Sequence, residues 1–214
     1  MNKKSPKGKS SRRWLQEHRS DSYVKQANLA GYRSRAVYKL AQIDNHDHLF
    51  HAGMTVVDLG AAPGGWSQWI KRSLHDQVRL FALDILPMEP LPGVTFIQGD
   101  FREPVVLDEL LNQLGHHKAD IVISDMAPNI SGVKAIDQPR AMLLAELARD
   151  FALDVLSPRG HFLTKIFQGE GFDFYVKGLR AHFERVVVRK PKASRSRSPE
   201  VYVLAKAFQG NNEL

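Results

Sequence analysis

A nine-residue stretch, Asp58-Leu59-Gly60-Ala61-Ala62-Pro63-Gly64-Gly65-Trp66, decides the fold of this chain. An apolar run, Met54–Leu59, leads into it, and a segment with helical periodicity, Trp66–Leu74, follows it. Three glycines and a proline form a tight turn in which the main chain can approach a ligand closely, just ahead of the amino end of a helix. The stretch therefore predicts a strand, a ligand-binding loop and a helix, which together open an α/β domain.

Expected strands and helices alternate on both sides of this loop. The expected strands are Met54–Leu59, Val78–Asp84, Val94–Gln98, Ala119–Asp125, Gly160–Phe167, Arg185–Val188 and Val201–Ala207. The expected helices are a region from Ser20 to about Asn45, in which Val37, Leu40 and Ile43 share one face, and then Trp66–Leu74, Pro104–Leu114, Pro139–Leu156 and Phe172–His182. This alternation, with near-continuous apolar strands, predicts a mostly parallel sheet with helices on both faces. The two strands in succession at the end predict an antiparallel pair, joined by the basic loop 189–199.

The length and composition indicate one globular domain. The chain has 214 residues, of which 43% are hydrophobic and 25% are charged, which is ordinary for a globular protein. We expect a basic disordered tail over residues 1–12, a single domain over residues 13–208 and a C-terminal tail over residues 209–214. The absence of cysteine excludes a disulfide scaffold, a thiolate zinc site, an iron–sulfur cluster and a thiol nucleophile. With no long apolar run, and no apolar segment after the basic start, we expect a cytoplasmic protein that does not bind membranes.

Basic residues are concentrated in two places. Residues 1–40 contain 11 Lys and Arg against 2 Asp and Glu, whereas the formal net charge of the whole chain is +7. The second basic run contains no acid, and its members are Arg185, Arg189, Lys190, Lys192, Arg195 and Arg197. Two such patches on an otherwise mildly acidic body favour RNA or DNA as a partner. For residues 1–12, a solvated tail that only aids solubility is an equally good interpretation.

Acidic residues mark the ends of the expected strands. Asp84 and Asp125 end their strands, Asp100 lies two residues beyond its strand, and Asp58 lies near the end of the first one. Ligands of open α/β sheets bind at the carboxyl ends of the strands. The loop reads G-x-x-x-G-G, which is neither the dinucleotide fingerprint nor a P-loop. A nucleoside without phosphate, held by carboxylates, fits S-adenosylmethionine better than NAD. The alternative is that these aspartates only form caps and turns.

Three segments together resemble a known family. They are Asp58–Ser67, Ser124–Asn129 (Ser-Asp-Met-Ala-Pro-Asn) and Lys165–Gly171 (Lys-Ile-Phe-Gln-Gly-Glu-Gly). They resemble the bacterial large-subunit ribosomal RNA 2′-O-ribose methyltransferases of the FtsJ/RrmJ type. The resemblance extends over most of the chain and includes two further stretches, Ser11–Arg19 and Ser194–Tyr202. It implies the Rossmann-like fold of S-adenosylmethionine-dependent methyltransferases, with six parallel strands and one antiparallel strand.

The resemblance also implies the site residues. A Lys–Asp–Lys–Glu tetrad carries the reaction in that family, and its matching positions are Lys39, Asp125, Lys165 and Glu200. The family's cofactor contacts correspond to Gly64, Trp66, Asp84, Asp100 and Asp125. The implied cofactor is S-adenosylmethionine, with no metal. The implied substrate is a uridine of 23S ribosomal RNA, in the peptidyl-transferase A-loop of the assembled large subunit, and not DNA. We expect a monomer.

The expected reaction is an in-line transfer of the methyl group to a ribose 2′-oxygen. A neutral hydroxyl is a poor nucleophile, so Lys165 is expected to take its proton while Asp125 orients the lysine. Lys39 would supply a second cation, and Glu200 would either hold Lys39 or accept a hydrogen bond from the substrate. Without the motifs, Lys165 would be interpreted as an exposed lysine at a strand end. The phosphates flanking the target nucleotide are expected to contact basic residues of the two patches, namely Arg33, Arg35, Lys39, Arg195 and Arg197.

Other functions are compatible with parts of the sequence. A messenger-cap or transfer-RNA 2′-O-methyltransferase would share the tetrad. A base N-methyltransferase would have a paired proline and an aromatic residue after Asp125, which Met126–Pro128 lacks. The intact tetrad disfavours an RNA-binding assembly factor with an inactive site, and the glycine pattern disfavours a dehydrogenase. The histidines are expected to be exposed loop residues and not metal ligands; they are His46, His48, His51, His116 and His117.

Overall fold

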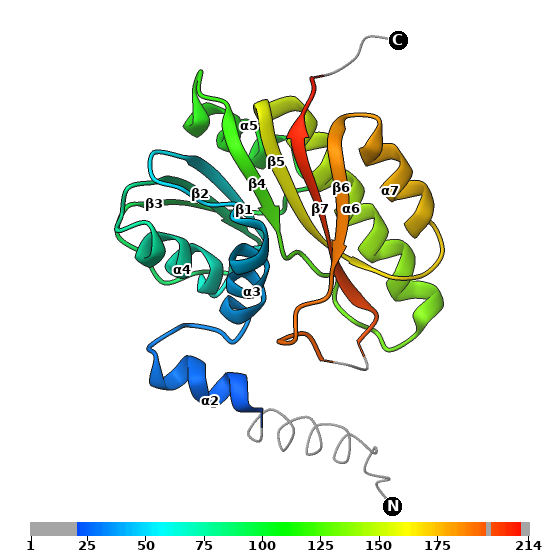
Figure 1. The fold of residues 1–214 in the computed structure, drawn as a ribbon, viewed down its shortest axis with the longest axis horizontal. Coiled ribbons are helices and arrows are strands. Elements are labelled where there is room, and N and C mark those ends of the chain that lie inside the picture. Colours follow the sequence, from blue (N-terminus) through cyan, green and yellow to red (C-terminus); the bar gives the residue numbers. More distant parts are fainter. Residues whose placement is uncertain (1–20, 196–197, 211–214) are drawn as a thin grey trace, which may run out of the picture.

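The computed structural model describes residues 21–195 and 198–210 and contains a seven-stranded sheet between two layers of helices (Figure 1). The strands are β1 (Thr55–Leu59), β2 (Arg79–Asp84), β3 (Val94–Gln98), β4 (Ala119–Ser124), β5 (Leu156–Phe167), β6 (Phe183–Arg189) and β7 (Glu200–Phe208). The helices are α2 (Ser22–Leu29), α3 (Val37–Asp47), α4 (Gly65–Ser73), α5 (Pro104–Leu114), α6 (Lys134–Val155) and α7 (Phe172–Arg180). The predicted fold class is confirmed, whereas the tail predicted over residues 1–12 lies outside the described residues.

The last strand along the chain, β7, lies inside the sheet and not at its edge. The order is β3-β2-β1-β4-β5-β7-β6, and β7, drawn in red, lies between yellow β5 and orange β6 (Figure 1). Strands β1 to β5 pair in parallel, whereas β7 is antiparallel to both of its neighbours. Glu200, the first residue of β7, therefore pairs with Phe167, the last residue of β5. The start of β7 thus lies at the same edge of the sheet as the carboxyl ends of the parallel strands.

Each face of the sheet has its own apolar core. Because successive side chains of a strand point to opposite faces, β1 supplies Val57 and Leu59 to one core and Val56 to the other. The first core is completed by α5, α6 and α7, and the second by α3 and α4. The predicted apolar face of α3 is confirmed, because Val37, Leu40 and Ile43 are all buried. Among the described helices, none is long and apolar enough to cross a lipid bilayer.

Several expected boundaries were wrong. The single helical region from Ser20 is instead two helices, α2 and α3, separated by residues 30–36. Helix α6 was expected to begin at Pro139, because proline favours the first turn, but it begins at Lys134. Asp137 explains the earlier start. Its carboxylate accepts hydrogen bonds from the main-chain N–H groups of Ser131 (2.8 Å) and Gly132 (2.9 Å), which joins the preceding loop to the first turn of the helix.

Candidate active site

The glycine loop between β1 and α4 is held by the carboxylate that ends the neighbouring strand β2. Asp84 Oδ2 accepts a hydrogen bond from the N–H of Ala62 at 2.8 Å, and its Oδ1 accepts one from Leu86 at 2.8 Å. Gly64 has a φ of +100°, and a Cβ atom there would lie 2.8 Å from Met88 Sδ. A side chain at this position would be strained and would occupy the space beside the loop. The predicted strand, loop and helix are therefore confirmed, and the packing of the loop against Met88 requires a glycine at position 64.

Asp58, next to this loop, is a fully buried carboxylate. Its Oδ2 accepts a hydrogen bond from Ser67 Oγ at 2.6 Å, while among the described residues its Oδ1 has no hydrogen-bond partner. Burial raises the pKa of Asp58 to about 7, and the charges of Asp125 and Asp84 add to this rise. A carboxylate with one unsatisfied buried oxygen, beside two others, creates a site that favours a cation.

Two further residues that the resemblance assigns to the cofactor have other partners in the structure. The Trp66 side chain is buried, and its indole N–H donates to the carbonyl of Ala36 at 2.8 Å. As the second residue of α4, Trp66 still has a main-chain N–H without a partner in its own helix. Asp100 accepts hydrogen bonds from Arg102 through both carboxylate oxygens, and these bonds lower the pKa of Asp100 to about 2. Each oxygen accepts two hydrogen bonds, because the main-chain N–H of Arg102 also donates to Oδ1, so a ligand would have to displace a bond from Arg102 to reach Asp100.

The four residues of the expected tetrad come together as two ion pairs. Lys165 Nζ lies 3.0 Å from Asp125 Oδ1 and also donates to the main-chain carbonyl of Asp125. Lys39 Nζ, from α3, lies 2.6 Å from Glu200 Oε1. The side chains are 8%, 18%, 12% and 15% exposed for Lys165, Asp125, Lys39 and Glu200, so both pairs are largely shielded from water. The interpretation of Lys165 as an exposed surface lysine is therefore wrong.

Tyr202 connects the two pairs, and the sequence reasoning did not identify it. Its hydroxyl donates to Asp125 Oδ1 at 2.8 Å, and Lys39 Nζ lies 5.7 Å from the centre of its ring. Burial raises the pKa of Asp125, but the ammonium groups of Lys165 and Lys39 and the bond from Tyr202 outweigh this effect, so the pKa is lowered overall. Burial and the charges of Asp125 and Glu200 raise the pKa of Tyr202 well above its ordinary value, so the tyrosine remains a donor.

The segment before β7 fixes Glu200 from a second direction. Ser194 Oγ donates to Glu200 Oε1 at 3.0 Å, and Lys190 Nζ donates to the carbonyl of Ser198 at 2.6 Å and to the carbonyl of Glu200. Sequence reasoning assigned Lys190 only to a basic run and did not consider Ser194. The signal for Tyr202 was available, because residues two apart on a strand share a face, and Glu200 was already a candidate.

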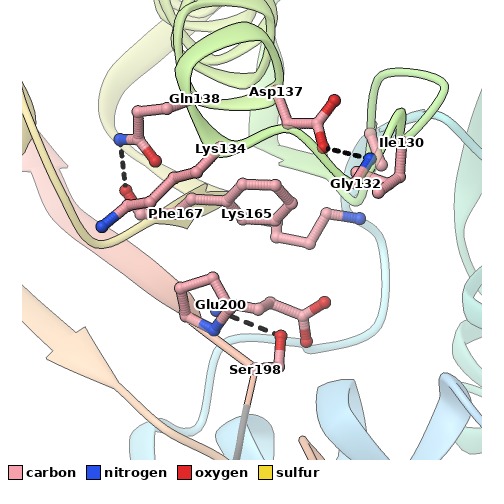
Figure 2. A pocket seen from close by; sticks show the side chains of 11 residues that line it. Ile130, Gly132, Lys134, Asp137, Gln138, Lys165, Phe167, Ser198 and Glu200 are labelled. Carbon is pink, nitrogen blue, oxygen red and sulfur yellow. Dashed lines mark hydrogen bonds between the residues drawn. The ribbon is translucent and has the colours of Figure 1, made fainter.

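A pocket of about 500 Å³ opens beside the ion pairs (Figure 2). Lys165 and Glu200 both reach into it, from β5 and β7, and Phe167 forms part of its wall. Its other side is formed by the loop after β4 and the start of α6, which contribute Ile130 and Gln138. The tetrad therefore faces a concave site large enough for a nucleoside.

Two arginines that were expected to contact phosphates also have partners within the protein. Arg33 donates to the carbonyls of Pro63 (3.3 Å), Glu89 (2.5 Å) and Pro90 (2.9 Å), and so connects the glycine loop with the segment after β2. The second arginine, Arg35, forms an ion pair with Asp21 at 3.1 Å and donates to the carbonyl of Ala193. Both also precede α3, whereas they were expected on one helix with Lys39.

The second basic run is partly internal as well. Arg189 binds Asp47 through Nε and Nη2, each at 2.7 Å, which joins β6 to α3. Lys192 is exposed and Arg195 is partly exposed, whereas Arg197 lies outside the described residues. Fewer basic side chains of this run are therefore available to a polyanion than the sequence predicts. Among the described basic residues of the run, Arg195 is the nearest in sequence to Glu200.

The histidines do not form a metal site in the described part of the chain, where no group of three or more potential ligands is arranged to hold a metal ion. His46 lies in the last turn of α3, not in a loop, and its Nδ1 is 3.5 Å from a carboxylate oxygen of Asp47. Helix α3 continues to Asp47, so Asn45, His46 and Asp47 are helical.

Comparison with known proteins places these features in a wider group. The profile of the FtsJ-like methyltransferase family matches residues 32–208. A protein of Legionella pneumophila (strain Paris) named "Ribosomal RNA large subunit methyltransferase E" is 61% identical over 200 residues, which cover 94% of this chain and 97% of that protein. A Pseudomonas aeruginosa protein of the same name is 59% identical over 204 residues, covering 95% and 99%.

Solved structures agree at the level of the fold. A protein of Plasmodium falciparum named as a ribosomal RNA methyltransferase superposes with a TM-score of 0.75 at 31% identity, covering 84% of this chain and all of that one. Human Methyltransferase-like protein 13, solved in complex with SAH, superposes with a TM-score of 0.56 over 82% of each chain. It is 15% identical, so it shares the fold alone.

Proposed function

Because the chain belongs to the family of FtsJ-like methyltransferases, we propose that it transfers a methyl group from S-adenosylmethionine to the ribose 2′-oxygen of a uridine in 23S ribosomal RNA. The acceptor is RNA within the assembled large ribosomal subunit, which implies a cytoplasmic location. The names of relatives that are 59–61% identical support this substrate. The family match supports one catalytic domain that ends near residue 208.

The observation that carries the proposal is the arrangement of the two ion pairs. Lys165–Asp125 and Lys39–Glu200 lie at the carboxyl edge of the sheet and are linked by Tyr202, and Lys165 and Glu200 line a pocket that does not include the glycine loop. A site for methyl transfer to a hydroxyl needs this order: a place for the donor, a base, and a place for the acceptor.

The residues around the glycine loop fit S-adenosylmethionine. The glycine loop leads into the amino end of α4, where main-chain N–H groups are available to a ligand. Asp84 has lone pairs left for the ribose hydroxyls, because each of its oxygens accepts one hydrogen bond. The adenine amino group would replace one of the bonds that Arg102 donates to Asp100. The unsatisfied oxygen of Asp58, close enough to Asp125 for their charges to interact, favours the cationic part of the ligand. When bound, S-adenosylmethionine supplies an electrophilic methyl group on a sulfonium.

Lys165 is the base in this proposal. Its uncharged amine would accept the proton of the 2′-hydroxyl while the oxygen–carbon bond forms and the bond between that carbon and the donor sulfur breaks, so that the proton ends on Nζ and the donor leaves as a neutral thioether. Asp125 holds Nζ through both a carboxylate oxygen and the main-chain carbonyl, which fixes its position. Lys39, held by Glu200, places a second positive charge near the site. Much of the rate comes from holding the acceptor oxygen in line with the methyl group.

The proposal is tested with labelled S-adenosylmethionine and large ribosomal subunits that lack the modification. We expect label on the subunit RNA, recovered after digestion as 2′-O-methyluridine. Cofactor binding is measured separately on the same protein. Binding without any label on the subunits would reject this substrate and leave the methyltransferase fold intact, and labelled base in place of labelled ribose would reject the acceptor atom.

Arg33 and Arg195 are expected to affect different ligands, although both are arginines near the site. Arg33→Ala removes three hydrogen bonds to the carbonyls of Pro63, Glu89 and Pro90, so we expect the Kd for S-adenosylmethionine to rise by roughly tenfold. Its RNA binding should keep the salt dependence of the unaltered protein. Arg195→Ala should leave the cofactor Kd unchanged and reduce the slope of log K against log salt by about 1.

Isothermal titration with the cofactor, and RNA binding measured between 50 and 200 mM salt, separate the two effects. Each variant is the control for the other. A reduced salt slope for Arg33→Ala with an unchanged cofactor Kd would return Arg33 to the phosphate-binding role that the sequence predicted.

A further inference from the structure

The pocket beside the tetrad is distinct from the glycine loop. In the described part of the chain, its lining includes Lys165 and Glu200 but neither the glycine loop nor the strand-end carboxylates Asp84 and Asp100. If the donor occupies the loop side, as the proposed function requires, the pocket is where the acceptor lies. The ribose must reach Lys165, so the remainder of that nucleotide has to extend into the pocket or away from the protein.

The walls of the pocket suit a flat base better than a phosphate. Phe167, Ile130 and Pro199 present apolar surface, and Figure 2 shows the Phe167 ring next to the Lys165 side chain in the wall of the opening. Four of the eleven lining residues are charged. Lys165 and Glu200 are paired with other members of the tetrad, and Asp137 accepts hydrogen bonds from the loop before α6, which leaves Lys134 as the fourth. Aromatic rings provide stacking surfaces for nucleic-acid bases in many RNA-binding proteins, because every base has an apolar face.

The position of Phe167 is fixed by the buried side chain of Gln138. Gln138 is 8% exposed, and its Nε2 donates to the carbonyls of Phe167 (3.0 Å) and Glu170 (3.2 Å). Asp137, the preceding residue, holds the loop that carries Ile130 through its bonds to Ser131 and Gly132. Both walls are therefore fixed by hydrogen bonds, so the pocket exists before the RNA binds.

We propose that this pocket receives the base of the acceptor nucleotide, turned out of its stack, with Phe167 as the surface on which the base packs. The proposal rests on the proposed function, since it specifies how the same site holds its substrate. A base that remains stacked in an RNA helix would keep its ribose in the backbone, away from a lysine on the concave side of the protein. Extruding the nucleotide brings the 2′-hydroxyl to Lys165 Nζ and places the base against the apolar wall of the pocket.

The test compares three substitutions of Phe167 on the full-length protein. Phe167→Ala and Phe167→Leu both lose the aromatic face, and we expect kcat/KM for unmodified large subunits to fall by roughly 10- to 100-fold. Phe167→Tyr keeps the ring and should remain within about threefold of the unaltered protein. The Kd for S-adenosylmethionine and the thermal midpoint are measured for each variant. Phe174→Ala is the matched control, because Phe174 lies on α7, outside the pocket lining, and is 79% exposed.

The outcomes distinguish failure of the proposed base-binding role of the pocket from failure of the proposed methyl transfer. A loss with alanine and leucine, recovery with tyrosine, and an unchanged cofactor Kd would support the proposal. Near-normal activity of Phe167→Ala would overturn it, as would equal losses for the leucine and tyrosine variants. Failure of the unaltered protein to methylate the subunits would instead reject the proposed function, whatever the variants do. Retention of subunits without cofactor gives a second readout, which should weaken for Phe167→Ala and not for Phe174→Ala.

Discussion

Lys165→Ala should abolish methyl transfer, with a loss of about 10³-fold or more, and leave the affinity for S-adenosylmethionine within about twofold. The reason is that Nζ of Lys165 is the group placed to take the proton of the 2′-hydroxyl, whereas the glycine loop and Asp84 lie on the cofactor side and keep their hydrogen bonds. Single-turnover transfer to unmodified large subunits and a cofactor titration on the same preparation measure the two quantities.

Lys165→Arg is the control that distinguishes a base from a cation. An arginine can keep the ion pair with Asp125, but its guanidinium does not lose a proton in a protein, so it cannot act as the base. We expect this variant to be as inactive as Lys165→Ala. Substantial activity of the arginine variant would mean that the positive charge of Lys165 is what the reaction needs, and the assignment of the base would be wrong.

The second large effect is on stability and depends on pH. Burial raises the pKa of Asp58 to about 7 in the folded protein, whereas the ordinary value for aspartate is 3.8. Between these values the folded state keeps a proton that the unfolded state has released. The free energy of unfolding is therefore expected to fall as the pH rises from about 4 to 7, by a total on the order of 4 kcal/mol.

Asp58→Asn removes this titration, and its amide oxygen can still accept the hydrogen bond from Ser67. Denaturant unfolding of both proteins at pH 5 and pH 8 should show the variant gaining about 3 kcal/mol relative to the unaltered protein at the higher pH. The variant should also bind S-adenosylmethionine less tightly, because it lacks the negative charge that Asp58 places next to the glycine loop and the ligand is a cation. Parallel pH profiles for the two proteins would show that Asp58 does not titrate in this range.

The sheet was predictable because its strands are short apolar runs separated by loops. Strand β3 and helix α5 have the bounds that the pattern predicts, and α5 begins at the proline expected in a first turn. The start of α6 was missed because it depends on Asp137 bonding to the preceding loop, a contact that periodicity does not reveal. The sequence pattern predicted that α6 begins at Pro139, whereas in the structure Pro139 lies inside the helix.

The sequence pattern predicted where the candidate site lies on the sheet, but not which of its side chains pair with one another. The strand-end rule located Asp84, Asp100 and Asp125, whereas the pairing of Lys39 with Glu200 joins residues 161 positions apart and came only from the resemblance. The roles of Arg33 and Arg35 were missed for a different reason. A positive charge in the sequence suggests a phosphate, but main-chain carbonyls are also acceptors, and only the fold shows that they are within reach.

The insertion of β7 between β5 and β6 has a consequence for the protein while it is being made. Chains are synthesised from the amino end, so the glycine loop, Asp125 and Lys165 leave the ribosome before Glu200 and Tyr202. Until β7 enters the sheet, Lys39 has no carboxylate to hold it and Asp125 lacks its tyrosine donor. A prematurely terminated chain that ends before residue 200 would retain the residues around the glycine loop but not a complete tetrad. Assembly of the tetrad therefore requires β7, so methylation awaits the synthesis and insertion of this strand.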